Sequence, residues 1–440
     1  MHATNVRLDL RIDTDKSITV GALALAVDEQ GHGRVVFEQL LESLDTRLVR
    51  HYCGEKYHHG NGRTRYQRAG TTTKTIVTVL GRSELTLSYV HDTAEESYFR
   101  PIEDTIQFNG QKRYQQCIST KAATLATKNS YRDATIVGNE FVEAPSASTI
   151  NRRVHQLGTQ LRERLAEATE DENVKTVIPD GTQVHSQEAD AFHAVNLTVS
   201  RDGVGDSFET TLLDVNANQP WEETATALED RNAIAESTAV VSDGEDSLVN
   251  AFCEGNHCHQ FDLAHLPRSL AYRLWQDTEL SLDERKEYVA EVINDSLHLK
   301  NSVALHARSS DWDAIRDRIT STHERIDRTI RHLELDGCLK SAQFLRKWKL
   351  SIIQFAEAAL EERRIPWTSN VVERKMGTVS KRCKNQWMRW SESGLEALLS
   401  LVLVQSIHPE LYREFVANQI GRGETDITIE VESRTTRGEV

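Results

Sequence analysis

The chain has 440 residues, 38% of them hydrophobic, which suffices for about two to four domains with buried cores, and no apolar run approaches the roughly 18 residues of a membrane span. Because residues 1–15 are polar and lack the layout of a secretory signal, we expect a soluble, cytoplasmic protein with no membrane partner. The net charge of −15, taken alone, disfavours nucleic-acid binding, because a polyanion is repelled unless positive charge is concentrated locally.

Residues 1–115 are predicted to form a small α+β module. Three strand-like runs, Val6–Ile12, Lys74–Leu80 and Glu84–Val90, accompany one amphipathic helical segment, Val35–Tyr52.

A stretch rich in Gly, Arg, His and Tyr, Cys53–Gly70, interrupts this module and is predicted to be a loop. Its basic and aromatic composition suits contacts to phosphates and bases. Metal binding by Cys53, His58 and His59 is the alternative, although the paired, short-spaced ligands of a structural zinc site are missing. The cations expected to contact DNA are Arg63, Arg65 and Arg68.

Residues 116–170 have the capping and helix-breaking residues that are typical of a helix-turn-helix. Ser130 is placed to cap one helix, Gly138–Pro145 interrupts it, and Ser146 or Ser148 caps a second helix. The exposed start of this second helix is where a recognition helix meets base edges and phosphates. A plain helical hairpin with a solvated arginine face is the alternative. The residues expected to contact DNA are Ser148, Asn151, Arg152 and Arg153.

Residues 174–262 contain five strand-like runs, with a helical stretch, Trp221–Ile234, between the third and the fourth. The runs are Thr176–Pro179, Ala194–Ser200, Thr210–Val215, Ala239–Ser242 and His259–Phe261. Three consecutive strands followed by alternating helix and strand predict a mixed sheet in an α/β domain.

The 98 residues Arg268–Ile365 contain no proline and one glycine, which predicts several long helices. These helices are expected to form either a separate bundle or an insertion in the α/β domain. After Pro366, one more helix is expected to pack on the sheet of that domain. We therefore predict an α/β core made of residues 171–266 and 366–420, interrupted by the all-α residues 267–365. The polar residues 421–440 are expected to form a flexible tail.

Three acidic residues stand in contexts that suit metal binding. Asp180 and Asp243 each follow an apolar strand-like run and precede a glycine, which places a carboxylate at the rim of a sheet. Glu373 lies 130 residues after Asp243, ahead of a basic helical segment. Three such carboxylates can hold two Mg²⁺ ions for in-line attack at a phosphodiester, whereas each Asp-Gly pair alone is a common turn. The competing acids are Asp214, Glu245 and Asp246.

The order of these motifs resembles that of DDE transposases with a ribonuclease H-like core, and within them the Mutator-like branch. In that branch a helical insertion separates the second aspartate from the glutamate, and "DLAH", Asp262–His265, fits its Asp/Cys-x-x-His motif. The segment "TSNVVERKMGTVSKR" is similar to its Asn-x-x-Glu-Arg signature. Over nearly the whole chain, the succession of "YRDA", "STINRR", "IPDGT", "VVSDGEDS" and "FDLAH" is similar to haloarchaeal insertion-sequence transposases of the ISH six group.

This resemblance implies an enzyme, a DNA transposase that binds the ends of an insertion sequence and catalyses metal-dependent strand cleavage and strand transfer. Asp180, Asp243 and Glu373 would be catalytic and would hold two Mg²⁺ ions, for which Mn²⁺ can substitute. Asp262 and His265 would be the family motif, whose chemical role the sequence does not give. The implied partners are double-stranded DNA, as terminal inverted repeats and target, and further copies of the chain in a dimer or larger assembly at the nucleoid.

Two other functions remain as alternatives. One is a two-metal nuclease or resolvase without strand transfer, and the other is a DNA-binding regulator derived from a transposase. A haloarchaeal origin would account for the composition, since only 15 of the 52 basic residues are lysine against 67 acidic residues, a surface that a salt-rich cytoplasm tolerates. An ordinary acidic protein is the alternative.

The segment that follows Glu373 is the most densely basic part of the chain. Between Arg374 and Trp390 it holds six cations and no acid. Its tryptophans suit stacking on an unpaired base, with burial in the core as the alternative. The residues expected to contact DNA are Arg374, Lys375, Lys381, Arg382, Lys384 and Trp387.

The six cysteines follow no regular spacing, so we expect reduced thiols rather than a disulfide framework. A zinc site would have to be built from the Cys and His residues around residues 253–265, whose spacing matches no standard ribbon or finger. We therefore expect no zinc. The residues of that alternative are Cys253, His257, Cys258, His259 and His265.

Overall fold

The computed structural model describes residues 32–54, 65–104, 106, 108–188, 191–204, 207–253, 256–277, 280–384 and 388–420. The chain divides into two compact units, one of residues 1–153 with 414–440 and one of residues 154–413. The predicted strand Val6–Ile12 and the predicted tail, 421–440, lie outside the described residues. Among the helices that are described, none is long and apolar enough to cross a membrane.

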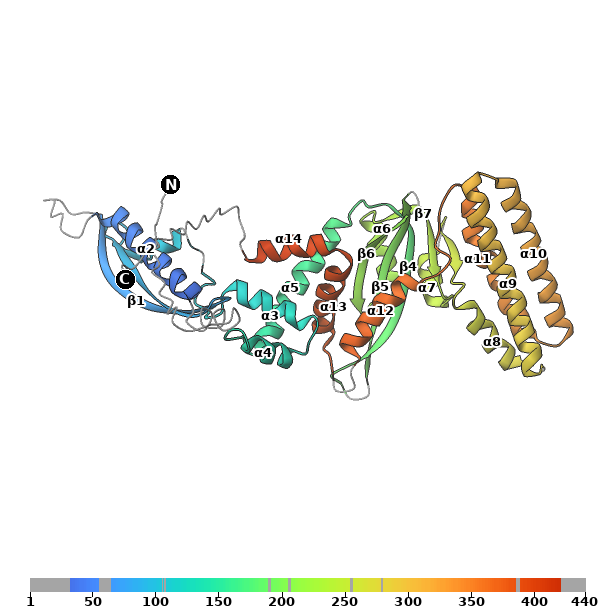
Figure 1. The fold of residues 1–440 in the computed structure, drawn as a ribbon, viewed down its shortest axis with the longest axis horizontal. Coiled ribbons are helices and arrows are strands. Elements are labelled where there is room, and N and C mark those ends of the chain that lie inside the picture. The colour runs from blue at the N-terminus through green and yellow to red at the C-terminus, as the bar shows by residue number, and fades with distance from the viewer. Residues whose placement is uncertain are drawn as a thin grey trace, which may run out of the picture. The chain divides into compact units, whose positions relative to one another are not determined.

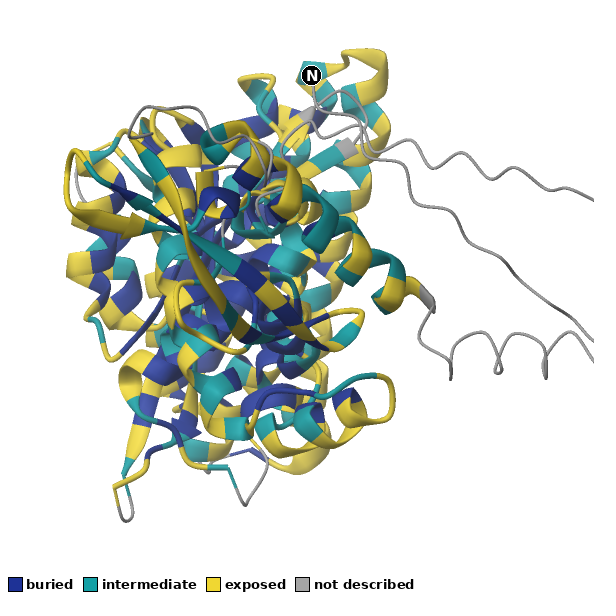
Figure 2. Ribbon diagram, turned by 90° about the vertical axis from the view of Figure 1, so that its left-hand side faces the viewer, coloured by how far each residue is buried: buried dark blue, intermediate teal, exposed yellow. Residues whose placement is uncertain are grey.

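In the first unit, one helix packs on a three-stranded antiparallel sheet with the order β1-β2-β3 (Figure 1). Strand β2 alternates buried and exposed residues, and the buried set, with Leu85 and Leu87, packs against Leu41 and Leu48 of the helix. Figure 2, with buried residues in dark blue, shows this segregation of buried from exposed positions. The elements are α2 (His32–Cys53), β1 (Tyr66–Thr78), β2 (Gly81–Asp92), β3 (Ser97–Phe99) and the short η1 (Pro101–Asp104).

The predicted loop Cys53–Gly70 is wrong at both ends. Cys53 is the last residue of α2, and Gly54 ends the helix with a left-handed φ of 71°, as glycine permits. Tyr66 already belongs to β1 and pairs with Asp92 of β2. The first residues of β1 are mostly exposed, so the strand begins without the apolar alternation by which a strand is recognised in a sequence.

Three helices, α3 (Gln116–Ala126), α4 (Tyr131–Asn139) and α5 (Ala147–Ala168), occupy the predicted helix-turn-helix region. The Ser130 hydroxyl accepts the Asp133 N–H at 3.1 Å, as predicted for a capping residue. Of the two serines considered for the second cap, Ser146 makes the bond, from the Thr149 N–H. The boundary between the two units falls inside α5.

The second unit contains the predicted mixed sheet, with the order β6-β5-β4-β7-β8. Strands β4, β5 and β6 are antiparallel neighbours, whereas β7 runs parallel to β4 and β8 parallel to β7. The chain is therefore an α/β protein in this part, as predicted. The strands are β4 (Val174–His185), β5 (Phe192–Val204), β6 (Ser207–Ala217), β7 (Ile234–Ser242) and β8 (Cys258–Phe261).

Helices cover both faces of this sheet (Figure 1). Val177 of β4 packs with buried residues of α6 and α7, and Gly181 lies beside the Trp221 ring of α6. Because side chains alternate along a strand, Thr182 faces the other way, and its hydroxyl contacts Lys384 at the end of α12. The helices are α6 (Trp221–Asp230), α7 (Asp246–Phe252), α12 (Asn370–Cys383) and α13 (Glu392–Ile407). The last described helix, α14 (Pro409–Ile420), follows α13, and a second boundary between the two units falls inside it.

Side chains of α13 and of the residue that follows it bind backbone N–H groups of the edge strand β6. The Ala217 N–H donates to Glu396 Oε1 and the Leu212 N–H to His408 Nε2, both at 2.9 Å. These bonds satisfy groups that an open sheet edge would leave available for aggregation.

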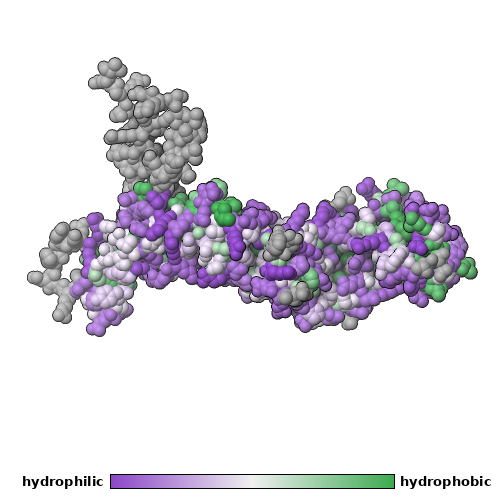
Figure 3. All heavy atoms as spheres, turned by 90° about the horizontal axis from the view of Figure 1, so that it is seen from below, coloured by the Kyte–Doolittle hydropathy of each residue, from purple (hydrophilic) through white to green (hydrophobic). Residues whose placement is uncertain are grey.

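Four helices separate β8 from α12, in the segment predicted to be all-α. Helix α11 packs against both α10 and β8, and the Phe355 N–H donates to the buried Gln260 side chain of β8 at 2.7 Å. The segment is therefore an insertion that packs on the edge strand β8. Its helices are α8 (Leu266–Asp277), α9 (Leu282–His306), α10 (Trp312–Leu335) and α11 (Leu339–Leu360), with the short η2 (Ala307–Ser309). On the face seen in Figure 3, hydrophilic residues dominate.

Candidate active site

Asp180 lies within β4 and not at its end, so the sequence prediction of its place was wrong. The strand continues to His185, and Asp180 pairs with Leu197 of β5. The Asp-Gly pair indicated a turn, but Gly181 continues the extended pairing, with Asn196 opposite it. Since Gly181 faces α6, alternation points the Asp180 side chain to the face that α12 covers.

Asp243 follows β7 directly, as predicted. Val177 of β4 pairs with Val240 of β7 in parallel, and Asp180 and Asp243 each lie three residues beyond that pair. The turn depends on Gly244, whose φ is 85° and whose added Cβ would lie 2.6 Å from the Phe261 ring. The two aspartates therefore come from neighbouring parallel strands at the same level of the sheet.

Glu373 lies in the first turn of α12, where a carboxylate is favoured by the helix dipole. The carbonyl of Ser369 accepts the N–H groups of Val372 and Glu373, which begins the helix. The Glu373 Oε1 atom receives a hydrogen bond from His265 Nε2 at 2.6 Å. Helix α12 packs on β4, so Glu373 is brought to the strand that carries Asp180.

The charges of the three carboxylates act on one another. Burial raises the pKa of Asp180 to about 6; the Gly181 N–H opposes this rise, and the charges of Asp243 and Glu373 add to it. The nearby His265 lowers the same pKa to a smaller extent. Asp180, Asp243 and Glu373 therefore form a cluster of negative charge whose free energy a divalent cation would lower.

Asp262 and His265 border this cluster. Asp262 is fully buried, and His265 lies half-buried between Asp262 and Glu373. Burial lowers the pKa of His265. The bond to Glu373 and the charges of Asp262, Glu373 and Asp243 raise this pKa by more than burial lowers it, so it lies above its ordinary value. One ligand atom from each of Asp262, His265 and Glu373 lies within 4.8 Å of the others, so this group could hold a metal ion.

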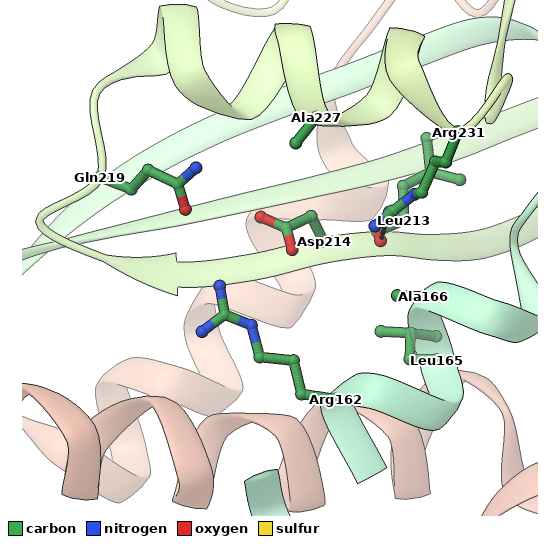
Figure 4. A pocket seen from close by; sticks show the side chains of 8 residues that line it. All are labelled: Arg162, Leu165, Ala166, Leu213, Asp214, Gln219, Ala227 and Arg231. Carbon is green, nitrogen blue, oxygen red and sulfur yellow. Dashed lines mark hydrogen bonds between the residues drawn. The ribbon is translucent and has the colours of Figure 1, made fainter. Parts of the chain in front are cut away.

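The competing acids lie elsewhere. Asp214 accepts a hydrogen bond from Asn216 and belongs to a separate cavity of about 140 Å³, where Figure 4 shows it between Arg162 and Arg231. Asp246 is in the first turn of α7 and pairs with Lys347 of α11. Glu245 precedes that helix, and its carboxylate accepts the Ser247 hydroxyl at 2.5 Å. These acids have structural partners of their own.

The basic segment after Glu373 splits into exposed and buried cations. Arg374, Lys381 and Lys384 are exposed, whereas the Lys375 ammonium binds the carbonyl and hydroxyl of Ser406. Arg382 is 6% exposed, so its predicted place on a DNA-binding surface is wrong. Its guanidinium lies over the ring of the buried Trp390. Trp387 lies outside the described residues.

Gly377 lies one helical turn after Glu373. A Cβ added to this glycine would meet no atom within 4 Å, so the space beside it is open.

The cations expected to bind DNA in the first unit also differ in their surroundings. Arg65 is paired with Asp92 at 2.7 Å and with Glu95 at 3.1 Å, which neutralises its charge locally. Arg68 donates to the carbonyl of Gly54, and Arg63 lies outside the described residues.

On α5, Ser148 and Arg152 are exposed, whereas Asn151 and Arg153 are partly buried. Arg153 donates to Thr120 at 3.0 Å and to Gln419 at 3.3 Å, and burial lowers its pKa. Ser148 and Arg152 are therefore the members of this set that are open to a partner.

The histidines of the zinc alternative have separate partners. His257 Nδ1 accepts the Thr238 N–H at 3.0 Å, and His259 Nε2 bonds the Ser242 hydroxyl at 2.9 Å. His265 bonds Glu373.

Sequence reasoning missed Ser369, which donates both its N–H and its hydroxyl to Asp262. A serine four residues before the motif glutamate, at the start of a helix, was the available signal.

The comparisons with known proteins bear on the first half of the chain. The chain matches no curated protein. Residues 21–237, which include Asp180 but end before Asp243, match the model of an uncharacterised protein family (UPF0236).

Proposed function

We propose that the chain is a DNA transposase that binds the ends of an insertion sequence and catalyses metal-dependent strand cleavage and strand transfer. The observation that carries the proposal is that Asp180, Asp243 and Glu373, from β4, the end of β7 and α12, lie near enough for the charges of Asp243 and Glu373 to act on Asp180. Their separation along the chain and the raised pKa of the partly buried Asp180 are typical of a functional site and not of a surface cluster.

The sheet supports a ribonuclease H-like core. Three antiparallel strands followed by two parallel ones, in the order β6-β5-β4-β7-β8, correspond to the sheet of that fold. The α8–α11 insertion between β8 and α12 corresponds to the helical insertion of the Mutator-like branch. Both features support the resemblance to transposases of the ISH six group.

The residues present fit hard divalent cations, because the cluster offers carboxylate oxygens and a negative charge that His265 offsets only in part. Asp180, Asp243 and Glu373 would hold two Mg²⁺ ions, or Mn²⁺ in their place, which when bound supply an activated water or 3′-hydroxyl and stabilise the leaving oxygen. The chain's own part is to hold the three carboxylates near one another; burial and, to a smaller extent, the charges of Asp243 and Glu373 raise the pKa of Asp180.

DNA would approach the site along α12. Arg374, Lys381 and Lys384 are exposed on or beside this helix, and Gly377 leaves room next to Glu373 for a sugar-phosphate backbone. The exposed Ser148 and Arg152 at the start of α5 are the corresponding candidates for reading the ends of the element.

Replacing Lys381 and Lys384 together by alanine is expected to weaken binding to any DNA sequence, because phosphate contacts carry no sequence information. The slope of log affinity against log salt should fall by roughly one for each lysine. Lys175→Ala, at an exposed lysine of β4, is the control. Fluorescence anisotropy over a salt series measures the slope. An unchanged slope in the double variant would contradict DNA binding at this face of α12.

Arg152→Ala and Arg153→Ala are expected to act differently. Arg152→Ala should weaken binding to the element ends without changing the melting temperature, since this arginine is exposed. Arg153→Ala should lower the free energy of unfolding by about 1 kcal/mol or more, because it leaves Thr120 and Gln419 without their donor. Calorimetry and electrophoretic mobility shifts separate the two effects. Full end binding by Arg152→Ala would contradict the recognition-helix assignment.

The function itself is tested with the purified full chain and duplex DNA taken from the flanks of its gene. Cleavage at a discrete position with Mg²⁺, and none with EDTA, is the expected result. Intact DNA under both conditions, at salt concentrations where the chain is folded, would contradict it.

A further inference from the structure

The helical insertion is closed at its base by hydrogen bonds between residues that precede it and residues that follow it. The Leu263 N–H donates to the Trp367 carbonyl at 3.0 Å. The Ser369 N–H donates to Asp262 Oδ2 at 2.9 Å, and the Ser369 hydroxyl donates to the same oxygen. These bonds join residues more than 100 positions apart, so α12 is fixed directly to the end of β8.

Asp262 is poorly placed to bind a cation, although it lies near His265 and Glu373. It is fully buried, its Oδ1 accepts the Ala264 N–H at 2.6 Å, and its Oδ2 accepts both donors of Ser369. Three of the roughly four acceptor sites of a carboxylate are thereby filled by protein donors. Asp262 therefore serves as an anchor for Ser369.

Anchoring Ser369 fixes the position of Glu373. The Ser369 carbonyl accepts the first N–H groups of α12, including that of Glu373, so the first turn of the helix follows Ser369. His265 begins α8 in the same way, with its carbonyl accepting the Ser269 N–H, and its ring donates to Glu373 Oε1. The weaker contact from the Ser369 hydroxyl, at 3.5 Å, falls on the same oxygen. Within the described residues, Oε2 is thus the oxygen left for a cation.

We infer that Asp262 and His265 are positioning residues for Glu373, which hold its carboxylate in place through Ser369 and through one carboxylate oxygen, and that they are not themselves metal ligands. The inference rests on the proposed function, in which Glu373 binds the cation together with Asp180 and Asp243. It gives the Asp-x-x-His motif a physical role at the base of the insertion.

Mn²⁺ binding to the full chain tests the inference without DNA or activity. Pulsed electron paramagnetic resonance of the wild-type complex should show no coupling to an imidazole nitrogen. His265→Ala should lower the Mn²⁺ affinity about 10- to 100-fold, as removal of a partner of a metal-bound carboxylate does, with the number of ions and the melting temperature unchanged. His265→Gln, whose amide can donate to Glu373, should recover part of the affinity. A nitrogen coupling that His265→Ala abolishes, or an unchanged affinity in that variant, would overturn the inference.

Asp262 is tested through its partner, because Asp262→Asn can unfold the chain by placing an amide against the donors of Ser369. Ser369→Ala removes one of the two bonds to Asp262 and should lower the Mn²⁺ affinity by a smaller factor than His265→Ala while leaving the chain folded. Equal affinity to the wild type would contradict the anchoring role. Failure of the proposed function gives a different result, since Asp180→Asn would then bind Mn²⁺ as tightly as the wild type does.

Discussion

Glu373→Gln is expected to lower Mg²⁺-dependent cleavage of the element ends by several orders of magnitude. The change keeps the size and the helix propensity of the side chain, and the neutral amide can still accept the bond from His265, but it loses the charge that a hard cation requires. DNA binding and the melting temperature should stay unchanged. Gel-based cleavage of labelled duplexes measures the rate.

Glu373→Asp is the sharper variant, because it keeps the charge and shortens the reach by one methylene. A misplacement of about 1 Å can cost roughly a hundredfold in rate, so we expect low activity that Mn²⁺ partly restores. Glu362→Gln, an exposed glutamate at the end of α11, is the matched control and should cleave normally. Wild-type cleavage by Glu373→Gln would place the third ligand at another residue.

Asp180→Asn is expected to abolish cleavage and at the same time to stabilise the metal-free protein. The pKa of Asp180 is about 6 in the folded chain against an ordinary value of 3.8, so the carboxyl group contributes stability below about pH 4 that is lost as the pH rises through 6. At pH 7.5 in EDTA, the asparagine variant should be more stable by on the order of 1–3 kcal/mol. It should therefore melt several degrees higher.

The difference in melting temperature should shrink as the pH falls through 6 and vanish near pH 4. Saturating Mg²⁺ should stabilise the wild type but not the variant, because ligand binding to the native state adds to stability. Differential scanning calorimetry over this pH range makes the measurement. Asp317→Asn, at an exposed position of α10, controls for a generic effect of the amide. A metal-free Asp180→Asn protein less stable than the wild type at pH 7.5 would contradict the unfavourable surroundings of the Asp180 carboxylate, which burial and the charges of Asp243 and Glu373 create.

The sequence predicted the existence and order of the five strands, because a sheet covered on both faces contains continuous apolar runs, but it found only the most apolar part of β4 and β7. It misplaced the end of β4 because Asp180-Gly181 has the composition of a turn, while pairing with β5 keeps the backbone extended through it. Strand pairing is a long-range interaction that local composition does not report.

The three carboxylates could be proposed from their local contexts, but their closeness could not. His265 and Glu373 are 108 residues apart. Their contact depends on the positions of α8, the first helix of the insertion, and of α12, the helix that follows the insertion. Arg382 was misjudged for the opposite reason. Its charge predicted a surface position, whereas the Trp390 ring provides a face on which the buried guanidinium lies.

One strand-transfer measurement distinguishes a transposase from a simple nuclease. The full chain is incubated with Mg²⁺, a duplex that ends in the 3′-hydroxyl of the element end, and a supercoiled plasmid, and the plasmid is then sequenced for joined ends. We expect covalent joining of the 3′-end to plasmid DNA, and we expect Asp180→Asn, Asp243→Asn and Glu373→Gln to lose it. The absence of any joined product, from a chain that does cleave uncut element ends, would contradict strand transfer and would identify the chain as a nuclease.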